Sequence, residues 1–245
     1  AKDETRYQQL TQLENIFPPG DDGLGYSMGE FFASMVDLAN APGDNSARQA
    51  VLARAADVSD RFANAAERLD ILQAGVRSDM QNSAATVTEL AARVAEINAQ
   101  ISGNRGSNIQ PYDLMDQRDN LIAQISEYVN VTTIPASDGT VGVFLAGGQR
   151  LVLGAESASL TVQPDEMDAS RSSLAMSSNG QTLPLSADLL SGGSIAGLMR
   201  FQNDDLVDAR NRLGQMAAAF ATQVNSAQAL GIDLNSNPGS DIFQI

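Results

Sequence analysis

The sequence lacks cysteine and histidine altogether, and both absences narrow the chemistry that the chain can perform. Without cysteine it has no disulfide, no thiolate nucleophile and no zinc–thiolate site. Without histidine it has neither the commonest general base nor the commonest metal ligand. A serine nucleophile would have no histidine partner, so we expect no enzyme, no catalytic residues and no bound cofactor or metal.

Tryptophan is also missing, aromatic residues make up only 5% of the chain, and positive charge is scarce. Lys2 is the single lysine, and 15 lysines and arginines face 30 aspartates and glutamates, which gives a net charge of −15. Such a charge repels phosphates, so nucleic acid is not an expected partner.

No apolar run approaches the roughly 18 residues that a membrane span needs, so we expect no membrane partner. The first ten residues also lack the pattern of a cleaved signal peptide. Neither end of the sequence has the pattern of a natural domain limit, and we therefore expect a fragment of a longer protein.

One stretch, residues 46–101, dominates what is present. It contains no proline and a single glycine, Gly75. Its apolar residues recur in steps of three and four, the spacing of one helical stripe, as in a coiled-coil seam. At about 1.5 Å per residue such a helix would span roughly 80 Å. The pattern therefore predicts a rod that packs lengthwise against other helices.

Shorter helical patterns surround this stretch. Residues 2–16 and 28–38 predict two helices, separated by a loop from Pro18 to Ser27. A second rod helix should start near Pro111 and lie antiparallel to the first. Its expected inner face consists of Leu114, Arg118, Leu121, Ile122, Ile125, Tyr128 and Val129. A third long helix is expected over residues 194–230, before Gly231.

The helical spacing of apolar residues ends near residue 130. Three short β-branched segments, residues 131–134, 140–145 and 149–153, are separated by the turn pairs Asp138-Gly139 and Gly147-Gly148, and they predict a β meander. Three further strands are expected at residues 160–162, 173–176 and 182–185.

These patterns predict a mainly α protein with a β part (α+β), built as an elongated antiparallel bundle of long helices. We divide it into the first part of a helical rod domain (residues 1–130), a β-rich section (131–191), and a long rod helix with the entry to an absent outer domain (192–245).

The last loop resembles part of a calcium site. Asp233, Asn235 and Asn237 alternate along residues 233–241, as ligands do in an EF-hand loop. However, Pro238 stands where that loop needs glycine, and Gln244 stands where it needs glutamate. A plain turn is favoured, and cation binding is left open.

Other site-like motifs are weaker. Asp21 and Asp22 are adjacent carboxylates, as are Asp204 and Asp205, whereas a glycosidase needs two carboxylates across a cleft. The glycine-rich residues 20–25 lack the preceding strand of a dinucleotide site. Solvated charge and an ordinary loop are the favoured interpretations.

The helical stripes are the remaining feature of the sequence that bears on function. Such stripes usually form the core of the chain itself. The alternative is that part of a stripe, or the opposite face, packs against neighbouring subunits. The expected partner surfaces are the exposed sides of residues 46–101 and 194–230.

Several local motifs, in their order along the chain, resemble the family of bacterial flagellar hook-associated protein 1, the first hook–filament junction protein. They are FFASMVDLA (31–39), ARQAVL (47–52), EINAQI (96–101), DLMDQRDNL (113–121), DGTV (138–141), GGQ (147–149), LVLG (151–154) and GIDLN (231–235). The segment at 113–121 is the most specific, and the resemblance covers nearly the whole chain.

The resemblance implies a flagellin-like fold and a secreted axial protein that joins hook to filament as a ring of subunits outside the cell. The implied partners are hook protein, the second hook-associated protein and neighbouring copies, with an export chaperone for an absent C-terminal segment. Flagellin or the second junction protein of the same family is an alternative. A secreted helical adhesin or effector that binds a host surface is an alternative from another class.

Overall fold

The computed structural model describes residues 1–103, 111–145, 147–178, 180–187, 190–233 and 236–244. They form two compact units. Unit 1 comprises Ala1–Leu10 and Gln73–Asp205, and unit 2 comprises Thr11–Leu72 and Leu206–Ile245. Long helices and small antiparallel sheets make up the described chain, which confirms the predicted α+β class. The division at residues 130 and 191 stays a prediction.

The predicted long helix is confirmed as α3, Asn45–Gly103, with 59 residues. Ahead of it, the Asp44 carboxylate accepts a hydrogen bond from the Ser46 amide at 2.8 Å, which satisfies one donor of the first turn. Gly75 lies inside the helix and does not interrupt it. The segment predicted as the loop after this helix, residues 104–108, falls outside the described residues.

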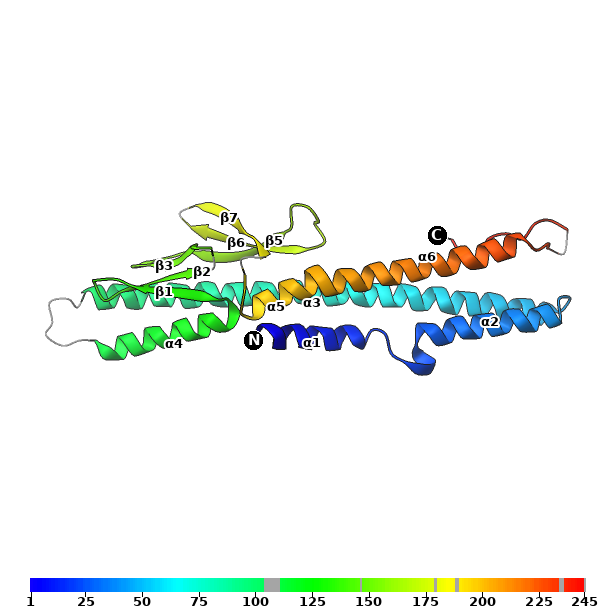
Figure 1. Cartoon of the computed structure of the whole chain (residues 1–245), viewed down its shortest axis with the longest axis horizontal. Helices are drawn as coiled ribbons and strands as arrows, with labels where there is room; N and C mark the ends of the chain where they lie inside the picture. The colour runs from blue at the N-terminus through cyan, green and yellow to red at the C-terminus, as the bar shows by residue number, and fades with distance from the viewer. Residues whose placement is uncertain (104–110, 146, 179, 188–189, 234–235, 245) are drawn as a thin grey trace. The chain divides into compact units, whose positions relative to one another are not determined.

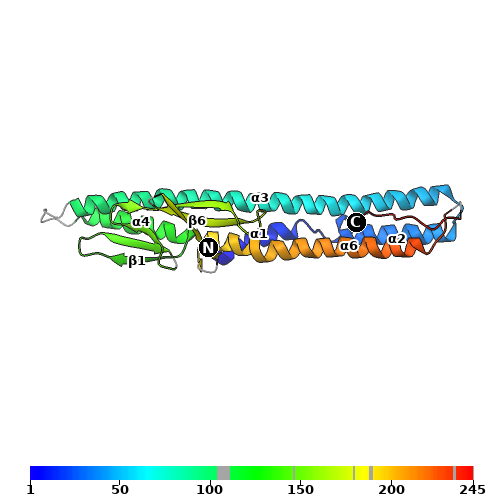
Figure 2. The same ribbon diagram turned by 90° about the horizontal axis from the view of Figure 1, so that it is seen from above.

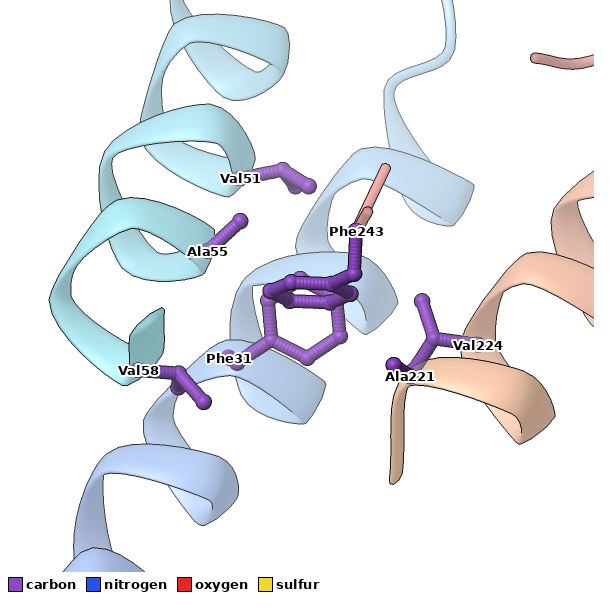
Figure 3. Close-up of a cluster of buried hydrophobic side chains, with 7 residues drawn as sticks. All are labelled: Phe31, Val51, Ala55, Val58, Ala221, Val224 and Phe243. Atoms are coloured by element: carbon purple, nitrogen blue, oxygen red, sulfur yellow. The ribbon is translucent and has the colours of Figure 1, made fainter. Parts of the chain in front are cut away.

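Unit 2 is built around the first part of α3. Helices α2, Leu24–Asn40, and α6, Val207–Ala229, both run alongside it (Figures 1 and 2). Figure 3 shows the rings of Phe31 and Phe243 between side chains of α3 and side chains of α6. The buried cluster consists of Phe31, Val51, Ala55, Val58, Ala221, Val224 and Phe243.

The predicted start of α2 was wrong. The helix begins at Leu24 rather than at Met28, one residue after a 3-10 turn over Gly20–Asp22, so the expected loop ends at Gly23 rather than at Ser27. Ser27 is buried and its hydroxyl donates to the Leu24 carbonyl at 3.0 Å. Packing of this first turn therefore outweighs the low helix propensity of Gly25 and Gly29.

The helical part of unit 1 contains most of α1 (Lys2–Glu14), the second part of α3, α4 (Tyr112–Tyr128) and α5 (Ser194–Arg200). Helix α4 runs antiparallel to α3 (Figures 1 and 2), as predicted. Most of its predicted inner face is buried, and Leu114 and Tyr128 are half-buried. The buried members are Arg118, Leu121, Ile122, Ile125 and Val129.

Two antiparallel sheets complete unit 1. The first has the order β1-β2-β3-β4, with β1 at Val131–Pro135, β2 at Val141–Leu145, β3 at Arg150–Leu153 and β4 at Glu156–Ser157. The second has the order β5-β6-β7, with β5 at Ser159–Pro164, β6 at Ser172–Ser178 and β7 at Gln181–Leu185. The six predicted strands are confirmed, and the two-residue β4 was not predicted.

The helix predicted over residues 194–230 is helical throughout but not uniform. Between α5 and α6 lies a π-helical segment, η3, at Phe201–Leu206. A π turn inserts an extra residue and so shifts the helical face. Phe201, Gln202 and Leu206 of this segment are all buried.

Candidate functional site

Three of the motifs that carry the family resemblance meet at one β-hairpin in unit 1. Asn98 of α3 is fully buried beside it. Its amide nitrogen donates to the Val141 carbonyl at 2.9 Å and the Gly154 carbonyl at 3.0 Å, and its oxygen accepts from the Val141 amide at 3.1 Å. The side chain thus pairs with strand β2 as a neighbouring strand would.

Arg118 of α4 holds the turn of the same hairpin. Its Nη1 donates to the Gly139 carbonyl at 3.0 Å, and its Nε donates to Asp119 at 3.0 Å. Gly139 has a φ of +81°, and a Cβ there would lie 3.2 Å from the Ile101 side chain. These motif residues attach a hairpin to two helices, so their role is structural rather than chemical.

Other polar side chains also form hydrogen bonds to the backbone of strands and segments that are distant in sequence. The Thr88 hydroxyl of α3 accepts from the Leu160 amide at 2.9 Å. Gln202 accepts from the Ser172 amide at 2.9 Å and donates to its carbonyl at 3.0 Å. In unit 2, Asn225 donates to the Phe243 carbonyl at 2.7 Å and accepts from its amide at 3.0 Å.

Sequence reasoning missed Gln202 and Asn225. A polar residue next to an apolar stripe is a usable signal, but it does not identify the distant backbone that it binds.

The two carboxylate pairs each have contacts of their own. Asp205 forms a bidentate ion pair with Arg6 at 2.7 and 2.8 Å, and this hydrogen bonding raises the pKa of Arg6. Asp204 lies 3.7 Å from Arg200. In the other pair, the Asp22 backbone carbonyl accepts from Arg61, and Asp21 is exposed.

One carboxylate has a clearly shifted pKa. Hydrogen bonds from Ser170, the side chain first and the backbone second, lower the pKa of Asp168, and the neighbouring Arg171 acts in the same direction. A lowered pKa is the opposite of what a general acid needs. Asp168 is therefore a turn-forming residue.

The cation question at residues 233–241 stays open. Asp233 accepts from the Asn237 amide at 2.8 Å and from its side-chain nitrogen at 3.3 Å, so its carboxylate bonds within the loop itself. Asn235 lies outside the described residues. In the part of the chain that the structure describes, no group of three or more potential metal-binding acidic side chains lies together.

None of the helices formed by the described residues is long and apolar enough to cross a membrane.

Exposed apolar side chains occur on the helices that were predicted to face partners. Leu52 and Ile71 of α3 are 57% and 64% exposed, and Met216 of α6 is 40% exposed. Helix α2, which was not predicted to face a partner, carries Phe32 and Val36 with exposures of 52% and 61%. Unit 2 thus offers apolar surface on all three of its helices.

Unit 2 also has a hollow of about 400 Å³ beside α3. The segment from Ile16 to Tyr26 lines one side of it, and α3 contributes Arg61, Asn64 and Arg68. The Arg61 guanidinium donates to the Asp22 carbonyl at 2.7 Å and is held by Asp57 at 3.2 Å. The hollow combines apolar walls with two arginines and one aspartate, Asp22.

The fold and these contacts define a helical scaffold that holds small sheets through buried polar side chains. A family model described as "Flagellar hook-associated protein FlgK helical domain" matches residues 10–243. The chain therefore belongs to the FlgK family of flagellar hook-associated proteins.

Relatives of known name agree with this membership. Flagellar hook-associated protein 1 of Salmonella typhimurium is 32% identical over 244 residues, and that of Escherichia coli is 30% identical over 243 residues. Each match covers 98% of this chain and 44% of the relative, so the chain spans less than half the length of the relatives it matches.

A solved structure, the flagellar hook junction protein FlgK from Burkholderia pseudomallei, matches with a TM-score of 0.90 at 30% identity. The match covers 97% of this chain and 43% of that one.

Proposed function

We propose that the chain is part of a structural, axial component of the bacterial flagellum that joins the hook to the filament as a ring of subunits. The observation that carries this proposal is the extent of the similarity. Proteins named flagellar hook-associated protein 1 match 98% of the chain, and the hook junction protein of B. pseudomallei has the same fold at a TM-score of 0.90.

The physical properties of the chain support a structural role. Stiffness suits a junction, and the buried contacts of Asn98, Arg118 and Gln202 fix sheets to helices with few alternative arrangements. The net charge of −15 opposes premature association of subunits before assembly.

The partners and location that follow are part of the same proposal. Hook protein would contact the assembled ring on one side, the second hook-associated protein on the other, and neighbouring copies within it. The protein would be exported to the outside of the cell, with a chaperone that binds a segment beyond this chain. No catalytic step is proposed.

An add-back experiment tests the proposal. Full-length protein is added to isolated hooks that lack it, followed by the second junction protein, the cap protein and flagellin. We expect filaments to grow only when this protein is present, as counted by electron microscopy. A mixture without it is the matched control.

Hooks that stay bare in the presence of the protein, or filaments that grow equally well without it, would contradict the junction role. Binding of the protein to host cells in the absence of hooks would instead support the adhesin alternative.

A further inference from the structure

The hollow in unit 2 has the chemistry of a docking groove. Its volume of about 400 Å³ lies within the roughly 300–1,000 Å³ of ligand-binding clefts. One wall is mostly aromatic and apolar and includes one acidic residue, Asp22, and the other wall carries Arg61 and Arg68. We call it the arginine groove and define it by Phe17, Tyr26, Arg61, Asn64, Arg68 and Met216.

One cation in this groove has no partner among the residues that the structure describes. Arg54, Arg61 and Arg68 follow one another at intervals of seven residues, so they lie on one side of α3. Arg54 pairs with Glu30 at 3.0 Å, and Arg61 binds Asp57 and the Asp22 carbonyl. For Arg68, which is exposed, the described residues provide neither a hydrogen bond nor an ion pair.

Unit 1 carries a projection of the opposite character. The loop between β5 and β6 contains Asp165, Glu166, Met167 and Asp168, which we call the acidic knob. Met167 is 95% exposed, the highest value among the large apolar side chains that the structure describes. An apolar side chain is thus presented to solvent between carboxylates.

The acidic knob is shaped by its own hydrogen bonds. Asp165 accepts from the Met167 amide at 2.9 Å, and Asp168 accepts from the Ser170 amide at 3.0 Å and forms an ion pair with Arg171 at 3.0 Å. Glu166 is exposed and takes no part in these bonds. A loop that is already ordered loses little conformational entropy on binding.

We infer that the acidic knob of one copy docks into the arginine groove of a neighbouring copy. In this contact Met167 lies against Phe17, Tyr26 and Met216, and Glu166 pairs with Arg68. A methionine side chain suits such a site because its thioether packs well against aromatic rings. The inference rests on the proposed function, since it requires copies to assemble next to one another.

Two arguments favour a second copy as the occupant. Every copy carries both surfaces, and because they differ, the contact is head-to-tail and can continue from subunit to subunit around a ring. In addition, each copy has a net charge of −15, so an attractive contact between copies must bring a local cation against a local anion.

Disulfide cross-linking tests the inference, because the 245 residues contain no native cysteine. Two full-length variants with different tags, Met167→Cys and Asn64→Cys, are mixed and assembled on isolated hooks, with any cysteine outside these residues replaced by serine. After mild oxidation we expect a dimer that carries both tags, at least about tenfold above control. The control pairs Met167→Cys with Ala66→Cys, an exposed position on α3 about 200° away from Asn64.

A charge swap tests the ion pair itself. Arg68→Glu and Glu166→Arg should each lower the yield of this dimer about tenfold, the loss expected for one interfacial ion pair, and combining them in every copy should restore it. Arg77→Glu is the matched control, because Arg77 is an exposed arginine on α3 outside the groove. It should leave the yield unchanged.

The outcomes separate this inference from the proposed function. If filament growth on hooks requires the protein but the Met167→Cys and Asn64→Cys variants form no more dimer than the control pair, the docking inference is wrong and the junction role stands. A tenfold loss in both Arg68→Glu and Arg77→Glu would also overturn it, since general charge would then explain the effect. If filaments grow without the protein, the junction role itself fails.

Discussion

Asn98 shows how single polar residues stabilise this molecule. Its carboxamide replaces a missing strand by pairing with both the amide and the carbonyl of Val141. In a site closed to water, an unpaired polar backbone group costs more than an ordinary hydrogen bond contributes. Each such side chain therefore contributes more to the free energy of unfolding than its small size suggests.

We expect Asn98→Ala to destabilise the fold by about 2–4 kcal/mol, because it leaves buried groups of Val141 and Gly154 without partners. Urea unfolding followed by circular dichroism measures the change, and hydrogen exchange at residues 131–145 locates it. Asn82→Ala, at an exposed position of the same helix, should stay within about 0.5 kcal/mol. Equal effects of the two substitutions would contradict this role of Asn98.

In unit 2, Asn225 holds the segment that ends at Phe243. Its oxygen accepts from the amides of Ile242 and Phe243, both at 3.0 Å. We expect Asn225→Ala to raise hydrogen exchange at these two amides by one to two orders of magnitude, which corresponds to about 1–3 kcal/mol. The rings of Phe31 and Phe220 would still contact Phe243, so the other amides of α2 and α6 should change little.

The exposed Asn211 provides a control on the same helix. If Asn211→Ala released the segment equally, the hydrogen bonds of Asn225 would not be what holds it.

At the scale of elements, α3 is the case in which local pattern and tertiary structure agree. Its helical stripe predicts residues 46–101, and the helix covers Asn45–Gly103. The one local conflict is Gly75, in a helix interior where glycine is about 1 kcal/mol less favourable than alanine.

Gly75→Ala should therefore stabilise the chain by about 0.5–1 kcal/mol, because a Cβ at this position meets nothing within 4 Å. The midpoint of urea unfolding should rise without a change in slope. A lower midpoint would mean that the glycine is needed at this point of the helix.

Gly193, before α5, should respond in the opposite direction. Its φ is +86°, and an added Cβ would lie 2.2 Å from the Tyr128 carbonyl oxygen, so we expect Gly193→Ala to cost about 3 kcal/mol or more. Gly154→Ala separates the two causes: Gly154 has a φ of +59° with open space around its Cα, and should lose only about 1–2 kcal/mol. Equal losses in the two variants would rule out the close contact as the cause.

Sequence reasoning missed the early start of α2 and the π-helical segment η3. Ser27 is buried in the first turn of α2, and Gln202, within the π-helical η3, bonds to Ser172. Gln202 and Ser172 lie 30 residues apart, so no local period reports their contact. By contrast, the six longer strands and their glycine turns were predictable, because alternation and turn chemistry are local.

For the whole molecule, the family was recognisable from local motifs in the sequence. The structural role of the residues in those motifs was not. Asn98, Arg118 and Gly139 belong to motifs that carry the resemblance, and in the structure they hold one hairpin in place. The arginine groove and the acidic knob could not be predicted, since each depends on where folding places segments that have no distinctive pattern. Contacts between copies were expected from the helical stripes and from the family resemblance, and the net charge of −15 adds a repulsion that such contacts must overcome.

That repulsion leads to a prediction for the intact chain. With a net charge of −15 at pH 7 and a pI of about 4.2, copies should repel each other in dilute buffer and associate as the pH falls toward 4.2. At pH 7, raising the ionic strength from about 0.01 to 0.15 M shortens the screening length from about 30 to 8 Å and should allow weak association. Light scattering measures both effects.

Circular dichroism must show that the associating species is folded. Asp168 has a lowered pKa in the folded chain, so its contribution to stability is present above its unfolded value of about 3.9 and is lost only as the pH falls through the lower folded value. The loop at residues 165–168 should therefore persist at pH 4.2. Scattering that stays flat down to this pH would contradict charge repulsion as the barrier between copies, and scattering that rises only together with loss of helical signal would indicate aggregation of unfolded chains instead.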